Sequence, residues 1–185
     1  MAYDPARHHR RSIRLKEYDY SWVGWYYITI CTRDHGCILG NLRDDLILEN
    51  YLGRMVRETW IDLPNHYAID LDDFVIMPNH IHGIIIINDS TVGAIHESPL
   101  QRDTKSVRRK MLLSKIIGRF KMTSAKNANI LLKKPGLPFW QRGFYEHIIR
   151  NDADLYRIRT YIRNNSLQWA LDEENPENVR RRSHE

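Results

Sequence analysis

Two kinds of hydrophobic pattern occur along the chain. Runs of aromatic and β-branched residues predict strands at 25–32, 69–77, 81–87 and 144–149. Apolar residues at helical spacing predict helices at 44–60, 105–126 and 152–165. The first of these helices places Leu48, Leu52, Met55 and Val56 on one side. Residues 36–40 fit either a short edge strand or a turn.

The order of these elements indicates the fold class. Residues 84–87 are apolar on both faces, which predicts a central strand that is covered on both sides. Strands and helices do not alternate regularly, so the pattern favours an α+β fold with helices packed on an antiparallel sheet. We expect one domain over residues 21–170, with a basic arm at 1–20, a flexible loop at 88–104 and a charged tail at 171–185.

Composition excludes several classes of protein. The chain has 185 residues, of which 42% are hydrophobic, and this is ordinary for a globular domain. The basic, polar N-terminus and the shortness of every apolar run predict neither a secretory signal nor a membrane span. Cys31 and Cys37 are too few for a disulfide framework, and their spacing is not that of a zinc knuckle. We expect a cytoplasmic, nucleoid-associated protein.

Charge is distributed unevenly. The net charge is +5, but residues 104–145 contain 11 basic residues and no acidic one, which leaves 17 basic and 23 acidic residues elsewhere. On the helix predicted at 105–126, Lys115, Arg119 and Lys126 each fall within about 20° of Arg108 at 100° per residue. This ridge is either a solvated helix face or a surface that binds a polyanion, and the acid-free run favours nucleic acid.

The His80-Ile81-His82 triplet is the first candidate for chemistry. In a strand, residues i and i+2 point to one face, so both imidazoles project together. Two neighbouring imidazoles are half of a metal site. The alternative is two histidines at a strand end, one of them satisfied by the backbone.

Two further segments stand out. Tyr161 and Asn165 are neighbours on the helix predicted at 152–165 and flank its buried stripe, although Tyr161 also fits an ordinary half-buried tyrosine. In residues 139–147, aromatic side chains alternate with polar and charged ones. Trp140 and Arg142 are therefore candidates to stack on and contact unpaired bases, or else the aromatic residues belong to the core.

Seven blocks of sequence together resemble the single-tyrosine HUH transposases of the insertion-sequence and REP-associated type. The most specific are M-P-N-H-I-H-G and F-W-Q-R followed by Y-E-H-I-I-R-N. The blocks span nearly the whole chain and occupy residues 11–15, 18–20, 27–32, 74–83, 139–142, 145–151 and 161–165.

The resemblance implies a ferredoxin-like HUH endonuclease fold that acts on single-stranded DNA. It implies that His80 and His82 bind a divalent metal, Mg²⁺ or Mn²⁺, and that Asn165 completes the ligand set. Tyr161 matches the nucleophile, which forms a covalent 5′-phosphotyrosine. Relatives usually have Asn-Pro at the end of the tyrosine block, where this chain has Asn165-Ser166. That difference would alter only the helix exit.

Glu146 and His147 are candidates to support the tyrosine, or they are structural. The predicted function is a transposase-type endonuclease that nicks and rejoins hairpin or palindromic DNA, as a monomer or a homodimer. The alternative is a domesticated regulator that binds nucleic acid on the same fold. A zinc-dependent hydrolase is a third option, but no carboxylate or third imidazole stands at a convincing spacing from the two histidines.

Overall fold

The computed structural model describes residues 23–88, 111–172 and 174–176. The elements in chain order are β1 (Gly24–Cys31), η1 (Arg33–His35), β2 (Gly40–Arg43), β3 (Leu46–Glu49), α1 (Tyr51–Ile61), η2 (Leu63–Asn65), β4 (Ile69–Ile76), β5 (His80–Ile87), α4 (Leu112–Leu131), β6 (Tyr145–Ile149), α5 (Asp152–Asn164) and η3 (Trp169–Leu171).

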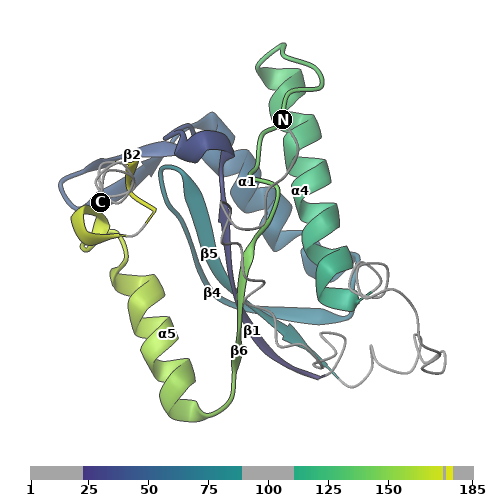
Figure 1. The fold of residues 1–185 in the computed structure, drawn as a ribbon, viewed down its shortest axis with the longest axis vertical. Coiled ribbons are helices and arrows are strands. Elements are labelled where there is room, and N and C mark those ends of the chain that lie inside the picture. Colours follow the sequence, from purple (N-terminus) through teal and green to yellow (C-terminus); the bar gives the residue numbers. More distant parts are fainter. Residues whose placement is uncertain (1–22, 89–110, 173, 177–185) are drawn as a thin grey trace, which may run out of the picture.

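A four-stranded antiparallel sheet in the order β4-β5-β1-β6 forms the centre of the fold (Figure 1). β5 pairs with β4 on one side and with β1 on the other. It is therefore an inner strand, as its apolar run predicts. Helices pack on this antiparallel sheet, so the predicted α+β class is confirmed.

The two faces of the sheet carry different helices. Side chains alternate along β1, so Tyr26, Ile28 and Ile30 join the larger core with residues of α1 and α4. Tyr27 points the other way and packs with Ile158 of α5. Figure 1 accordingly shows α5 across the sheet from α4 and α1. The candidate histidines lie on the α5 face.

Gly83 explains how the larger core approaches β5 so closely. A Cβ atom at this position would lie 2.6 Å from Cζ2 of Trp60 and 3.1 Å from Cβ of Phe74. Only glycine lets the buried Trp60 indole of α1 lie against the strand here. The helix layer is thereby fixed directly behind the histidine-bearing end of β5.

The predicted helix over 44–60 is wrong in its first part. Residues 40–49 form the β2–β3 hairpin, and its turn residues Asp44 and Asp45 have φ values of 50° and 59°. Two consecutive positive φ angles suit a tight hairpin turn rather than a helix. Asn50 then caps α1 by accepting hydrogen bonds from the backbone N–H groups of Leu52 and Gly53. Leu48 is consequently half exposed on β3 instead of buried.

The long basic helix differs from its prediction at its C-terminal end. α4 runs to Leu131, five residues beyond Lys126, because the helix-breaking Pro135 and Gly136 come later. Its apolar arc of Leu113, Ile116, Ile117 and Phe120 is fully buried, as predicted.

Some predictions concern residues that the structure does not describe. The arm at 1–20, residues 89–104 of the predicted loop, and Arg108 lie outside the described residues. The division into an arm, a domain at 21–170 and a tail stays a prediction. Within the described ranges, no helix has the length and apolar character that a membrane crossing requires.

Candidate active site

His80 and His82 open β5 and project from the same face of the sheet. His80 lies opposite Cys31 and His82 lies opposite Thr29 in the antiparallel register with β1. Both imidazoles are buried, and their ring centroids are 4.3 Å apart. The i, i+2 spacing therefore places the two rings side by side, as the strand pattern predicts.

Asn79 fixes the tautomer of the His80 ring. The Asn79 amide nitrogen donates to the backbone carbonyls of His35 and Glu174, so the amide oxygen faces His80. His80 Nδ1 lies 2.8 Å from that oxygen and must donate to it. The lone pair is then on Nε2, a buried atom with no hydrogen-bond partner among the described residues. Burial and the neighbouring His82 lower the pKa of His80 well below its ordinary value, so the ring is neutral near pH 7.

The His82 ring is held by two hydroxyl groups of β1. His82 Nδ1 lies 2.7 Å from Tyr27 Oη and 2.8 Å from Thr29 Oγ1. The Tyr27 ring also stacks on His82, with the centroids 5.5 Å apart. Burial raises the pKa of Tyr27, so this phenol stays protonated. These contacts leave Nε2 of His82 facing α5.

Helix α5 brings Tyr161 to the histidines. Asn151 caps the helix by accepting a hydrogen bond from the Asp154 backbone, and Ile158 and Ile162 pack on the sheet. Tyr161 Oη lies 3.4 Å from His82 Nε2, and the two ring centroids are 5.2 Å apart. The tyrosine and the imidazoles thus meet within a single chain.

Asp172 completes the cluster, and the sequence analysis missed it. Its Oδ2 accepts hydrogen bonds from Tyr161 Oη at 3.1 Å and from Asn165 Nδ2 at 3.0 Å. The same oxygen lies 3.9 Å from Nε2 of His82 and 4.0 Å from Nε2 of His80. Although Asp172 falls in the segment expected to be a charged tail, its carboxylate is buried, because the cluster supplies its polar partners.

The surroundings of Asp172 keep it ionised. Burial raises the pKa of this carboxyl, but the neighbouring His82 and His80 imidazoles and the hydrogen bond from the Glu174 backbone N–H outweigh that effect. The pKa is therefore lowered below its usual range. Asp172 is an anion beside two imidazoles at neutral pH.

This cluster has the donors that a divalent metal requires. One ligand atom from each of His80, His82 and Asp172 lies within 4.8 Å of the others, and all three residues are buried. Asn165 Oδ1 is another buried atom with no hydrogen-bond partner in the described part of the chain. Imidazole nitrogens together with carboxylate and amide oxygens suit a borderline divalent cation. The residues present therefore fit a metal.

A bulge in β4 anchors the tyrosine helix. The register with β5 shifts between Leu71 and Phe74, and Asp72 and Asp73 occupy the irregular stretch. Asp72 accepts two hydrogen bonds from the Arg159 guanidinium, at 2.9 Å and 2.5 Å. Asp73 forms an ion pair with Arg163 at 2.7 Å, one turn further along α5. The two ion pairs thus attach α5 to the β4 bulge on both sides of Tyr161.

Glu146 and His147, the two candidates to support the tyrosine, do not contact it as the sequence analysis expects. Glu146 pairs with Ile28 in the register of β6 and β1, and therefore lies on the face opposite the histidines. Its predicted support of the tyrosine is wrong for this reason. His147 Nε2 lies 2.7 Å from Asp154 Oδ2 and thereby ties β6 to the first turn of α5.

The predicted DNA-binding cations of α4 lie across the sheet from Tyr161. Lys115 and Lys126 are exposed on this helix, whereas the Arg119 guanidinium is 3.1 Å from the His66 ring. Arg142 is exposed just before edge strand β6. The structure therefore does not bring the α4 cations together with the metal cluster.

Trp140 is a core residue rather than a stacking platform. Its side chain is 6% exposed, and its Nε1 donates to Ser124 Oγ at 2.8 Å. The indole also packs against Phe120 and Phe139. The expectation that Trp140 stacks on DNA is therefore wrong, because the indole finds both apolar contacts and a hydrogen-bond partner inside the fold.

No family model matches the chain. An uncharacterised protein of Haemophilus influenzae is 38% identical to it over 179 residues, which are 92% of this chain and 96% of the relative. The chain belongs to the same family as this Haemophilus protein.

Among solved structures, a REP-associated tyrosine transposase bound to a REP hairpin has the same fold. The two match with a TM-score of 0.50 and 20% identity over 86% of this chain and 76% of that chain. A transposase structure from Deinococcus radiodurans aligns with a TM-score of 0.44 and 14% identity over 82% of this chain and 97% of that chain. The resemblance to the tyrosine transposases is thus confirmed at the level of the fold.

Proposed function

We propose that the protein nicks and rejoins single-stranded DNA through a covalent bond to Tyr161, as a transposase of the single-tyrosine type. The observation that carries this proposal is the position of the Tyr161 hydroxyl, 3.1 Å from Asp172 Oδ2 and 3.4 Å from His82 Nε2. A phenol so close to a metal-type cluster is placed to attack a phosphate that the cluster holds.

The metal would be held by His80, His82 and Asp172, with Asn165 beside them. The unpartnered Nε2 of His80 and Oδ1 of Asn165 in the described ranges support this assignment. A bound Mg²⁺ or Mn²⁺ supplies neutralisation of the charge on the phosphate oxygens. The chain itself presents both imidazoles in a fixed orientation, through Asn79 for His80 and through Tyr27 for His82.

In the proposed reaction, Tyr161 Oη forms a bond to phosphorus and the bond to the 3′ oxygen breaks. The phenol loses its proton in this step, and the leaving 3′ oxygen gains one. The lowered pKa of Asp172 makes this carboxylate a weak base. Asp172 therefore orients the hydroxyl through its hydrogen bond and does not hold the proton at the end of the step.

A DNA hairpin or palindrome is the proposed substrate. The related fold of a transposase bound to a REP hairpin supports this choice, as does the 42-residue acid-free segment. α4 and Tyr161 lie on opposite faces of the sheet. The DNA duplex would therefore contact α4, and the single-stranded DNA would run past edge strand β6 to reach Tyr161. Arg142 and Tyr145 are exposed along that path.

The test is adduct formation on a labelled single-stranded hairpin. Wild-type protein with Mg²⁺ or Mn²⁺ should form a covalent adduct that denaturant does not remove, and His80→Ala, His82→Ala or a chelator should abolish it. Tyr161→Phe should bind the hairpin but form no adduct, whereas Tyr156→Phe, an exposed tyrosine of the same helix, should behave as wild type. Hairpin binding without any adduct would favour the domesticated regulator instead. Cleavage without an adduct would favour a metal-dependent hydrolase.

A further inference from the structure

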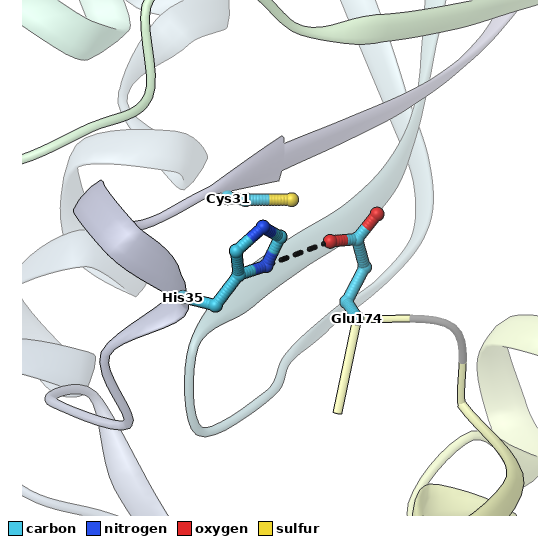
Figure 2. A group of neighbouring side chains, drawn as sticks. All are labelled: Cys31, His35 and Glu174. Atoms are coloured by element: carbon cyan, nitrogen blue, oxygen red, sulfur yellow. Dashed lines mark ion pairs between the residues drawn. The ribbon is translucent and has the colours of Figure 1, made fainter. Parts of the chain in front are cut away.

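A second group of metal-binding side chains lies next to the cluster of His80, His82 and Asp172. Cys31 is the last residue of β1, His35 ends η1, and Glu174 follows η3. Figure 2 shows the thiol, the imidazole and the carboxylate turned toward one another. One ligand atom from each lies within 4.8 Å of the other two, and His35 Nδ1 is 3.0 Å from Glu174 Oε2.

The chain holds these residues together at some conformational cost. Asp34 and His35 have φ values of 55° and 54°, a backbone region that is uncommon for residues other than glycine. Asn79 Nδ2 donates to the His35 carbonyl at 3.2 Å and to the Glu174 carbonyl at 2.6 Å. One buried amide therefore joins two of the ligand-bearing segments, which lie far apart in the sequence.

The donor set indicates which cation would bind. A thiolate, an imidazole and a carboxylate favour Zn²⁺ over Mg²⁺, which prefers oxygen ligands alone. Ligand atoms around a tetrahedral Zn²⁺ at about 2.0 Å are about 3.3 Å apart, close to the separation between His35 and Glu174. Three protein ligands leave a fourth position for water.

A supporting contact orients the imidazole. His35 Nε2 lies 2.7 Å from the amide nitrogen of Gln141, which donates to the ring in this structure. With a cation on Nδ1, the ring would carry its proton on Nε2, and rotation of the Gln141 amide by half a turn would present its oxygen to accept that proton. Metal-binding histidines regularly have such an acceptor on their second nitrogen. The Gln141 backbone N–H in turn donates to the Cys31 carbonyl at 2.9 Å. Gln141 therefore links two of the three ligand residues.

We propose that Cys31, His35 and Glu174 bind a Zn²⁺ ion, separate from the metal of the active site. This ion would fasten the C-terminal segment to the end of β1. Asp172 lies only two residues before Glu174, and Asn79 contacts both His80 and the Glu174 backbone. Occupancy of the zinc site would therefore hold Asp172 in place over the histidines. The binding itself does not depend on the proposed DNA chemistry.

The experiment is a titration of metal-free protein with Co²⁺, whose bond to a thiolate gives an intense charge-transfer absorption. The full chain should bind two ions and develop this absorption. His82→Ala should lose the active-site ion and keep the thiolate absorption. Cys31→Ser should lose the absorption, and the matched control Cys37→Ser, at the exposed second cysteine, should keep it. No DNA is present, so the result is independent of whether the protein cleaves DNA.

A further pair of variants guards against misfolding at the buried Cys31. His35→Gln and Glu174→Gln change half-exposed side chains, and each should weaken Co²⁺ binding at the thiolate site about tenfold or more while circular dichroism stays unchanged. Competition by Zn²⁺ should remove the absorption. Absorption that is unchanged in His35→Gln and Glu174→Gln, or that depends on Cys37, would overturn the proposal. Binding of only one ion, which is lost in His82→Ala, would also overturn the proposal.

Discussion

The Tyr161 hydroxyl and the Asp172 carboxylate are joined by a hydrogen bond of 3.1 Å across the turn that follows α5. The same carboxylate oxygen accepts from Asn165 and faces both imidazoles. Asp172 therefore connects the proposed nucleophile with all the proposed metal ligands, and its role is open to direct measurement.

Replacing Asp172 by Asn should weaken metal binding. The amide fills the same volume but removes the negative charge, so Mn²⁺ affinity at the histidines should fall about tenfold or more, and adduct formation should fall with it. Electron paramagnetic resonance of Mn²⁺ titrations measures the affinity. Asp62→Asn, a distant exposed carboxylate, is the control. If Asp172→Asn binds Mn²⁺ as wild type and cleaves faster, the carboxylate blocks the site instead of serving it.

The bulge in β4 should matter for catalysis through the position of α5. Asp72→Asn removes the ion pair with Arg159, which is partly exposed, and should cost about 1 kcal/mol of folding stability. Adduct formation should slow more than hairpin binding weakens, because the substitution loosens the helix that carries Tyr161 and spares the basic helix α4. Chemical denaturation and single-turnover kinetics measure the two effects. Equal losses in binding and in adduct formation would argue against this role.

The same ion pair predicts a pH dependence of stability. Hydrogen bonds from Arg159 lower the pKa of Asp72 below its usual range. Its contribution is therefore fully present above the unfolded pKa of about 3.9 and is lost as the pH falls through the lower folded value. The stability difference between wild type and Asp72→Asn should stay constant from pH 8 to about 5 and shrink below about pH 4. A difference that already shrinks between pH 7 and 5 would contradict the assignment.

The basic ridge should contribute to DNA binding separately from the chemistry. Neutralising Arg108, Lys115 and Arg119 should weaken binding to single strands of any sequence. Each lost phosphate contact should reduce the slope of log affinity against log salt by about 0.7. Fluorescence anisotropy at several salt concentrations measures this slope. An unchanged slope in the triple variant would place the DNA path elsewhere.

Tyr145, and not Trp140, should be the aromatic residue that stacks on a base. Trp140→Phe keeps the ring but loses the hydrogen bond to Ser124, so folding stability should fall by about 1–2 kcal/mol while DNA affinity is unchanged. Tyr145 is 39% exposed, and its ring lies 6.1 Å from that of Tyr27 at the site. Tyr145→Ala should weaken single-strand binding by about 1–3 kcal/mol if a base stacks there. The reverse pattern would restore Trp140 as the stacking residue.

The sequence predicts the sheet, the pairing of the histidines and the tyrosine helix because each depends on a local period. Alternation along 80–82 places both imidazoles on one face, and the capped helix at 152–164 places Tyr161 beside its buried stripe. The hairpin at 40–49 was missed because its two aspartates adopt positive φ angles, a conformation more often associated with glycine and asparagine.

Asp172 was missed for a different reason. It is followed by Glu173 and Glu174 in a charged stretch, and the preceding Leu171 is 81% exposed, so no hydrophobic period marks the position as buried. Its burial depends on the tertiary structure, which places it against the distant His80 and His82 as well as against Tyr161 and Asn165. The same holds for Cys31, His35 and Glu174, which only the completed fold brings together.

Peptide mapping of the covalent adduct tests the central proposal most directly. The protein is incubated with a hairpin labelled on each side of the nick, digested, and analysed by mass spectrometry. We predict one modified peptide, with the 5′ phosphate of the downstream fragment on Tyr161 and a free 3′ hydroxyl on the other fragment. Modification of Tyr145 or Tyr27, or scission that leaves every tyrosine unmodified, would contradict this account.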